Sequence, residues 1–313
     1  MDRIELKSII HSKRANLFYL EKCKVLVKDG RIVYLTQDSK NSSYWNIPAA
    51  NTTVIILGTG TSITNAAVRL LVSAGVSIGF SGNDCTPLFA GAEIEWVTPQ
   101  NEYRPTEYVQ GWLHMWFDED KRLKTAKYFQ TKRVEFIRKT WTSNRYFTEE
   151  GISISSNELN TIVTAFETAI GRCQSVTQLL TIEAAMTKAL YKEVATITGT
   201  PGFVRDRDSY DAVNRFLNHG NYLAYGLAAC VLWVLGIPHA FAVMHGKTRK
   251  GALVFDVADL VKDAVILPAA FIEGQKGTPD DQFRNACITQ LLDNKVMDYM
   301  FTVVETAALK DTP

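Results

Sequence analysis

Residues 23–35 run CKVLVKDGRIVYL, and this stretch decides how the first part of the chain folds. Two apolar runs, Cys23–Val27 and Arg31–Leu35, flank a short polar segment. Asp29 and Gly30 in that segment suit the positive backbone φ angles of a two-residue turn. The stretch therefore predicts a β-hairpin.

Other apolar runs of strand length lie on both sides of this hairpin, at Leu17–Leu20, Val54–Leu57 and Val76–Phe80. One helix is expected among them, from about Ser62 to Ala74, because Gly75 then follows as a stop signal. We therefore expect residues 1–95 to form a β-rich domain.

From Tyr103 onward, helical periodicity replaces the short apolar runs. Ser155-x-x-Glu158 and Ser175-x-x-Gln178 have the form of capping boxes, and Pro279 suits the first position of another helix. A long helix is expected from Tyr210 to Leu235. The predicted fold class is α+β, with an N-terminal β-sandwich-like domain (1–95) and a larger all-α domain (96–313).

The composition is that of an ordinary soluble protein, with 46% hydrophobic and 21% charged residues and a net charge of +1. Any DNA site would therefore depend on local basic patches. Five scattered cysteines without a CxxC pair favour reduced thiols in a cytoplasmic protein. The start of the chain lacks a secretion signal, and the apolar stretch Tyr222–Leu235 is too short to span a membrane, so no membrane association is expected.

Gly58-Thr59-Gly60 follows an expected strand and leads into an expected helix, as a phosphate-binding loop would. The full GxGxxG pattern and the P-loop lysine are both missing. We favour a tight turn with a Thr or Ser helix cap. A nucleotide-binding enzyme would bind ATP measurably, and we expect no such affinity.

Glu183 lies in the middle of the apolar face of the helix that opens at Ser175. A charged glutamate facing a core costs roughly several kcal/mol unless it is paired or binds a metal. A buried salt bridge and a metal ligand are equally good explanations of this residue by itself.

The second group of candidate residues is His245 with Asp256 and Asp259. The two aspartates are three residues apart, so they share a helix face, together with Asp263. Asp256 could instead cap the helix, and a lone histidine is usually a satisfied core residue. Together, an imidazole and two carboxylates suit Mg²⁺ or Mn²⁺, with an open position for a phosphate oxygen and an activated hydroxyl.

Basic and polar residues surround these groups. Lys247, Arg249 and Lys250 are candidates for binding DNA phosphates, although a solvated turn explains each of them singly. The helix before them presents a polar stripe that forms either a pocket floor or a helix interface, and Asn218 and Tyr222 on this helix are candidate DNA contacts. Residues 121–139 are rich in Lys and Arg with interleaved aromatics, which fits either a solvated face or a DNA track.

Glu183 within LLTIE, the helix around Asn218, and His245 followed by Asp256 and Asp259 together resemble the CRISPR-associated integrase family. This family is the larger of the two universal spacer-acquisition proteins. The resemblance spans almost the whole chain, and Gly111-Trp112 through Lys127 is similar to its type I-F branch. One departure is Gly251-Ala252, where many relatives carry a serine.

The resemblance implies that Glu183, His245 and Asp259 bind Mg²⁺ or Mn²⁺, with Asp256 as an acidic neighbour needed for activity. It implies that a 3′-hydroxyl of an incoming fragment attacks the backbone of double-stranded DNA at a CRISPR repeat, and that the same site can cut branched DNA. The implied partners are a second copy of the chain, joined through the β domain, and a small adaptation protein fused to a helicase-nuclease.

Two further alternatives remain at this stage. The first is a stand-alone metal-dependent nuclease that acts on branched DNA repair intermediates with the same ligands. The second is a non-catalytic DNA-binding scaffold whose acidic residues form structural pairs. A strand-transfer assay would separate both of them from an integrase.

Overall fold

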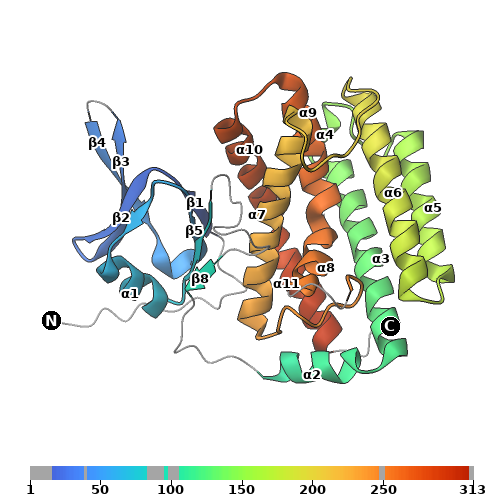
Figure 1. The fold of residues 1–313 in the computed structure, drawn as a ribbon, viewed down its shortest axis with the longest axis horizontal. Helices are drawn as coiled ribbons and strands as arrows, with labels where there is room; N and C mark the ends of the chain where they lie inside the picture. The colour runs from blue at the N-terminus through green and yellow to red at the C-terminus, as the bar shows by residue number, and fades with distance from the viewer. Residues whose placement is uncertain (1–15, 39–40, 83–94, 98–105, 247–250, 310–313) are drawn as a thin grey trace. The chain divides into compact units, whose positions relative to one another are not determined.

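The computed structural model describes residues 16–38, 41–82, 95–97, 106–246 and 251–309. The chain separates into two compact units, residues 1–104 and 105–313. The first unit holds two β-sheets and the second is helical, so the predicted fold class is confirmed (Figure 1).

The first unit contains two four-stranded sheets, ordered β1-β5-β7-β8 and β4-β3-β2-β6. In the first sheet only the β7–β8 pair is antiparallel, and in the second only the short β6 pairs in parallel. The strands are β1 (Asn16–Leu20), β2 (Cys23–Lys28), β3 (Arg31–Asp38), β4 (Asn41–Ile47), β5 (Thr52–Leu57), β6 (Ser62–Ile63), β7 (Ser77–Phe80) and β8 (Glu95–Val97).

The expected hairpin is the β2–β3 pair, which is in register from Cys23↔Thr36 to Lys28↔Arg31. Asp29 and Gly30 in its turn have φ angles of 51° and 72°. Positive φ at both central positions is what this tight turn requires, so the sequence signal and the backbone agree.

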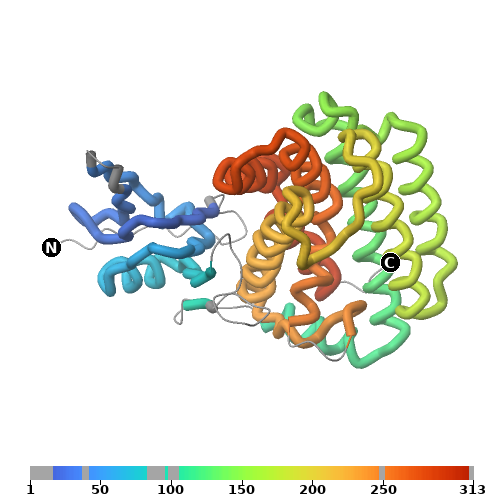
Figure 2. Tube along the Cα trace, turned by 45° about the horizontal axis from the view of Figure 1, so that its top comes forward, coloured from blue at the N-terminus to red at the C-terminus, as the bar shows by residue number. Residues whose placement is uncertain are grey.

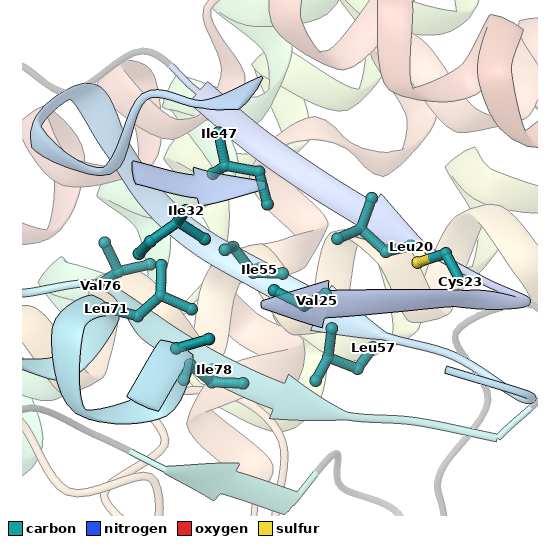
Figure 3. Close-up of a cluster of buried hydrophobic side chains, with 11 residues drawn as sticks. Leu20, Cys23, Val25, Ile32, Ile47, Ile55, Leu57, Leu71, Val76 and Ile78 are labelled. Carbon is teal, nitrogen blue, oxygen red and sulfur yellow. The ribbon is translucent and has the colours of Figure 1, made fainter. Parts of the chain in front are cut away.

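Side chains from both sheets meet in one apolar cluster, drawn in Figure 3. Val25 and Ile32 come from one sheet, and Ile55 and Ile78 from the other. Helix α1 (Asn65–Ser73) contributes the buried Leu71. The core of this unit therefore lies between its two sheets, as in a sandwich.

Helix α1 is shorter than expected, because Thr64 rather than an earlier residue caps it by accepting a hydrogen bond from the Ala67 amide. Ser62 and Ile63 instead extend the second sheet as β6. In the preceding glycine turn, the Gly58 amide donates to the Leu20 carbonyl at 2.8 Å. A Cβ on Gly58 would lie 2.3 Å from the Tyr19 hydroxyl, so the side chain of Tyr19 occupies the space beside this glycine.

The second unit consists of helices. In chain order they are α2 (Glu107–Trp116), α3 (Glu119–Ser143), α4 (Arg145–Thr148), α5 (Asn157–Arg172), α6 (Val176–Ile197), α7 (Ala212–Leu235), α8 (Ala252–Val261), the π-helical segment η4 (Lys262–Ile266), α9 (Leu267–Lys276), α10 (Asp280–Asp293) and α11 (Val296–Leu309). In the described part of the chain, no helix combines the length and apolar character that a membrane span needs.

Helix α7 packs against α8, α9, α10 and α11, which makes it the centre of this unit (Figure 2). Helices α5 and α6 lie side by side, with α3 next to them (Figure 1). Helix α3 also packs along α8 and η4. It therefore stands between α6, which carries Glu183, and α8, which carries Asp256 and Asp259.

Three helix starts differ slightly from the sequence expectations. Ser156, not Ser155, caps α5, while Ser175 caps α6 as expected. Pro279 takes the cap position of α10 rather than its first turn, and α7 begins at Ala212 after the cap Asp211. Neighbouring residues with similar capping ability cannot be ranked by local sequence alone.

Candidate functional site

Asp256 organises the turn that carries His245. Its side chain is buried, and one carboxylate oxygen, Oδ2, accepts hydrogen bonds from the amides of Val243 (2.7 Å) and Met244 (3.1 Å). The other oxygen, Oδ1, lies 3.1 Å from the His245 amide and 2.7 Å from its ring atom Nδ1. Asp256 therefore fixes both the backbone of this turn and the orientation of the imidazole.

The remaining ring nitrogen of His245, Nε2, lies 3.8 Å from Oδ2 of Asp259. That distance exceeds a direct hydrogen bond, but two ligands of one ion, each about 2.1 Å from it, can be this far apart. Burial lowers the pKa of His245, but the bond to Asp256 and the charges of Asp259 and Asp256 raise it overall. Asp256 thus holds the ring through Nδ1, while Asp259 lies beside Nε2 without a direct hydrogen bond.

Asp259 is buried and forms an ion pair through Oδ1 with Lys262, three residues later. Burial raises the pKa of Asp259, but Lys262, Arg133 and His245 lower it overall, so this carboxylate is charged in the interior. Lys262 also lies over the ring of Tyr225, 5.3 Å from its centroid. Its own pKa is raised, because Asp259 outweighs the effect of burial.

Glu183 faces inward from α6, with 15% of its side chain exposed. Its Oε1 accepts hydrogen bonds from Arg133 (2.7 Å) and from the Thr187 hydroxyl (3.1 Å). Arg133 also pairs with Asp263 in η4. The inward direction of Glu183 is therefore confirmed. Of the two explanations left open by the sequence, a buried salt bridge is present, and the pairing with Arg133 leaves a role as metal ligand a prediction.

The three predicted ligands share one arrangement. In each, one polar atom is held by the protein: Oε1 of Glu183, Nδ1 of His245 and Oδ1 of Asp259. The second polar atom of each makes no hydrogen bond to any described residue. These free N and O donors fit a hard divalent cation.

The structure brings together His245, Asp256 and Asp259, but not the complete predicted ligand set. Among the described residues, no group of three or more His, Cys, Asp or Glu side chains is placed to hold a metal ion. Glu183 belongs instead to the Arg133 contacts. The assignment of all three residues to one ion stays a prediction.

Two tryptophans of α2 support the turn that carries His245. The indole N–H groups of Trp112 and Trp116 donate to the carbonyls of Phe241 (3.0 Å) and Ala242 (2.7 Å). Helix α2 in turn lies directly on α11, where a Cβ on Gly111 would be 1.9 Å from the Ala308 carbonyl oxygen. The site is thus braced by a helix more than a hundred residues earlier in the chain.

The polar stripe of α7 is used inside the protein. Asn214 and Asn218 accept hydrogen bonds from Arg205 at 2.8 and 2.5 Å, and Asn218 donates to the Arg207 carbonyl at 2.9 Å. They therefore tie α7 to the loop before it. Tyr222 is half-buried and meets the ring of Tyr225 edge-on. A role for Asn218 or Tyr222 in DNA binding stays a prediction.

The other basic candidates have different outcomes. Lys247, Arg249 and Lys250 lie outside the described residues. In α3, the aromatics Phe129 and Trp141 are buried in the core rather than interleaved on a DNA-binding surface. Arg133 also points inward, whereas Lys124 and Lys139 are exposed.

Sequence reasoning missed the partners of the acidic residues, Arg133 and Lys262. A signal for Arg133 existed, because it is four residues after Phe129 and three before Phe136, on the buried face of α3. Lys262 is one helical turn after Asp259.

The family model of CRISPR associated protein Cas1 matches residues 17–296. The CRISPR-associated endonuclease Cas1 of Pseudomonas aeruginosa (strain UCBPP-PA14) is 50% identical over 314 residues, covering 98% of this chain and 97% of that protein. The protein of the same name from Pectobacterium atrosepticum is 48% identical, covering 98% and 96%. These comparisons confirm the family resemblance and support its type I-F branch.

Solved structures share the fold. A TtCas1–DNA complex has a TM-score of 0.67 at 22% identity and covers 94% of this chain and 92% of that one. A casposase bound to an integration product has a TM-score of 0.67 at 13% identity, covering 89% and 82%. A Cas6-RT-Cas1–Cas2 complex contains a chain with a TM-score of 0.63 at 11% identity, covering 92% of this chain and 34% of that chain.

Proposed function

The chain belongs to the Cas1 family of CRISPR-associated proteins, and from this membership we propose that it is a metal-dependent DNA integrase and endonuclease. It inserts short DNA fragments into a CRISPR array. The observation that carries the proposal is the pair formed by Nε2 of the half-buried His245 and Oδ2 of the buried Asp259, which lie 3.8 Å apart, with His245 held by Asp256 and Asp259 held by Lys262.

Glu183, His245 and Asp259 are the proposed ligands of Mg²⁺ or Mn²⁺, through Oε2, Nε2 and Oδ2. When bound, such an ion polarises a phosphate oxygen and favours deprotonation of an attacking hydroxyl. Asp256 holds the ring so that Nε2 faces Asp259. Arg133 pairs with Glu183 and Lys262 pairs with Asp259, which offsets part of the negative charge of the site.

The proposed reaction is a transesterification. The 3′-hydroxyl of the fragment forms a new phosphodiester bond with the array backbone, and the bond to the displaced 3′-oxygen breaks. One phosphodiester replaces another, so no ATP is required and alignment with charge stabilisation supplies the catalysis. Water in place of the hydroxyl gives cleavage instead.

We further propose that the chain acts on double-stranded DNA in the cytoplasm, as a homodimer with a small adaptation protein fused to a helicase-nuclease. A DNA complex and a complex with Cas2 among the structures that share the fold support DNA and a small adaptation protein as partners, while the homodimer and the helicase-nuclease fusion rest on the family resemblance. Lys247, Arg249 and Lys250 are proposed contacts to DNA phosphates, and Asn218 and Tyr222 are proposed DNA contacts beside them.

A strand-transfer assay tests this function. The protein, its small partner and Mg²⁺ or Mn²⁺ are mixed with a 3′-hydroxyl fragment and a leader–repeat duplex, and covalent joining is measured. Asp259→Asn should abolish joining, whereas the control Asp298→Asn in α11 should not. Joining by Asp259→Asn at the wild-type rate would refute the proposed site.

Cleavage without joining in the same assay would favour the alternative of a stand-alone nuclease for branched DNA. A casposase bound to an integration product is among the structures that share this fold, which supports integration over cleavage alone.

A further inference from the structure

Arg133 is a charged side chain inside the helical unit, with only 2% of its side chain exposed. A guanidinium has five N–H groups. Here Nε donates to Asp263 (2.8 Å), Nη1 to Glu183 (2.7 Å) and Gln130 (3.3 Å), and Nη2 to Thr187 (3.0 Å) and Asp263. Every N–H of the group therefore has an acceptor.

This arrangement connects the two parts of the proposed site. Glu183 and Thr187 are on α6, while Asp263 follows Asp259 by four residues in the π-helical segment that continues α8. Arg133 itself comes from α3, which packs against both α6 and α8. The guanidinium thus fixes the helix of Glu183 relative to the helix of Asp259.

Stability alone does not explain such a cluster. A buried ion pair is often no more stable than well-packed apolar residues of the same volume, but it restricts the geometry of the groups it binds. Segments with π-helical hydrogen bonding often occur at functional positions. A planar guanidinium with five donors, held between two helices, can fix the orientation of the side chains that it binds.

The contacts of Glu183 show what is oriented. Its two hydrogen bonds to described residues reach the same oxygen, Oε1, one from Arg133 and one from Thr187. Thr187 is itself held by Arg133, so the three side chains form a closed triangle. Two bonds to one oxygen fix the plane of the carboxylate and leave Oε2 available.

We propose that Arg133 and Thr187 are positioning residues that aim Oε2 of Glu183 at the divalent cation of the site. The proposal rests on the function proposed above, which names Glu183 as a metal ligand; what it adds is how the carboxylate of Glu183 is oriented. Thr187 acts only through Glu183 and Arg133.

The test is Mn²⁺ binding to the full-length chain, measured by the electron paramagnetic resonance of free Mn²⁺. Thr187→Val keeps the shape of the side chain and removes the hydroxyl. Thr181→Val is the matched control, because Thr181 is exposed on the same helix and, among the described residues, its hydroxyl bonds only the Thr177 carbonyl. We expect Thr187→Val to weaken Mn²⁺ binding about 10-fold or more, as for other residues that orient ligands, and Thr181→Val to leave it unchanged.

Arg133→Lys is a stronger variant, because an ammonium has three N–H groups against five and cannot form the planar fork. If this variant does not fold, Thr187→Val still decides the question. With a chelator present, Thr187→Val should still unfold in one cooperative transition, at a lower temperature than Thr181→Val because Arg133 loses one acceptor, and this separates positioning from loss of the fold.

Glu183→Gln separates the positioning role of Arg133 and Thr187 from the ligand role of Glu183. Weaker binding in Glu183→Gln together with wild-type binding in Thr187→Val would overturn the positioning role and keep Glu183 as a ligand. Wild-type Mn²⁺ binding in Glu183→Gln would overturn the ligand assignment itself, and with it this inference.

Discussion

Replacing Asp256 by Asn removes one charge and one acceptor from the most heavily used carboxylate of the site. Among the described residues, Asp256 has four hydrogen-bond partners, two at each oxygen: the amides of Val243 and Met244 at Oδ2, and the amide and Nδ1 of His245 at Oδ1. An amide side chain has only one acceptor oxygen. Its NH₂ group must therefore face one of the two pairs.

The less costly orientation keeps the oxygen toward Val243 and Met244. The NH₂ group then opposes the His245 amide and donates to Nδ1, which moves the ring proton to Nε2. Losing one charge-assisted bond costs about 1.5–3 kcal/mol, and weakening two others from charged to neutral costs about 1–1.5 kcal/mol each. The expected destabilisation is about 3.5–6 kcal/mol, and Nε2 can no longer bind a cation.

Urea unfolding followed by circular dichroism measures the first effect, and Mn²⁺ titration measures the second. Asp298→Asn is the matched control, since Asp298 is exposed in the first turn of α11. We expect the control to stay within about 1 kcal/mol of wild type. Unchanged Mn²⁺ affinity in Asp256→Asn would refute the reasoning on the ring proton.

Trp116→Phe removes the indole N–H that donates to the Ala242 carbonyl at 2.7 Å, so it should lower the free energy of unfolding by about 1 kcal/mol in urea. An unchanged urea midpoint would show that this bond does not support the turn. Burial raises the pKa of the Cys287 thiol to about 12, so iodoacetamide at pH 8 should modify it only after denaturation. Peptide mass spectrometry measures the modification, and alkylation of the native chain would contradict the burial of this thiol. Mn²⁺ at 100 times the wild-type Kd should raise the free energy of unfolding by about 2.7 kcal/mol, as measured by thermal unfolding. An equal gain in Glu183→Gln at the same Mn²⁺ concentration would argue against Glu183 as a ligand.

The sequence predicted the parts of the fold that depend on local chemistry. The β2–β3 hairpin follows from two residues that accept positive φ, and α6 begins at the serine that was expected to cap it. Strand β4 had no such signal, because its residues are mostly polar and exposed and it is a strand through its pairing with β3. Pairing of this kind is a tertiary property.

The same distinction applies to the site. The inward direction of Glu183 could be predicted because helical periodicity is local. Its partner Arg133 is 50 residues earlier, in a helix whose many cations suggested a DNA track, and spacing alone does not give such a pair. Similarly, no feature of residues 107–116 indicated that their two indoles would hold the turn of His245.

The chain supplies counter-charges of its own: Arg133 pairs with Glu183 and Asp263, and Lys262 pairs with Asp259. Folding of this acidic interior therefore does not wait for a cation from solution, in contrast to small zinc domains that are unfolded without their ion. The divalent cation would then bind reversibly to a chain that is already folded. Occupancy of the site would follow the free Mg²⁺ or Mn²⁺ concentration around it, while the protein framework persists in either condition.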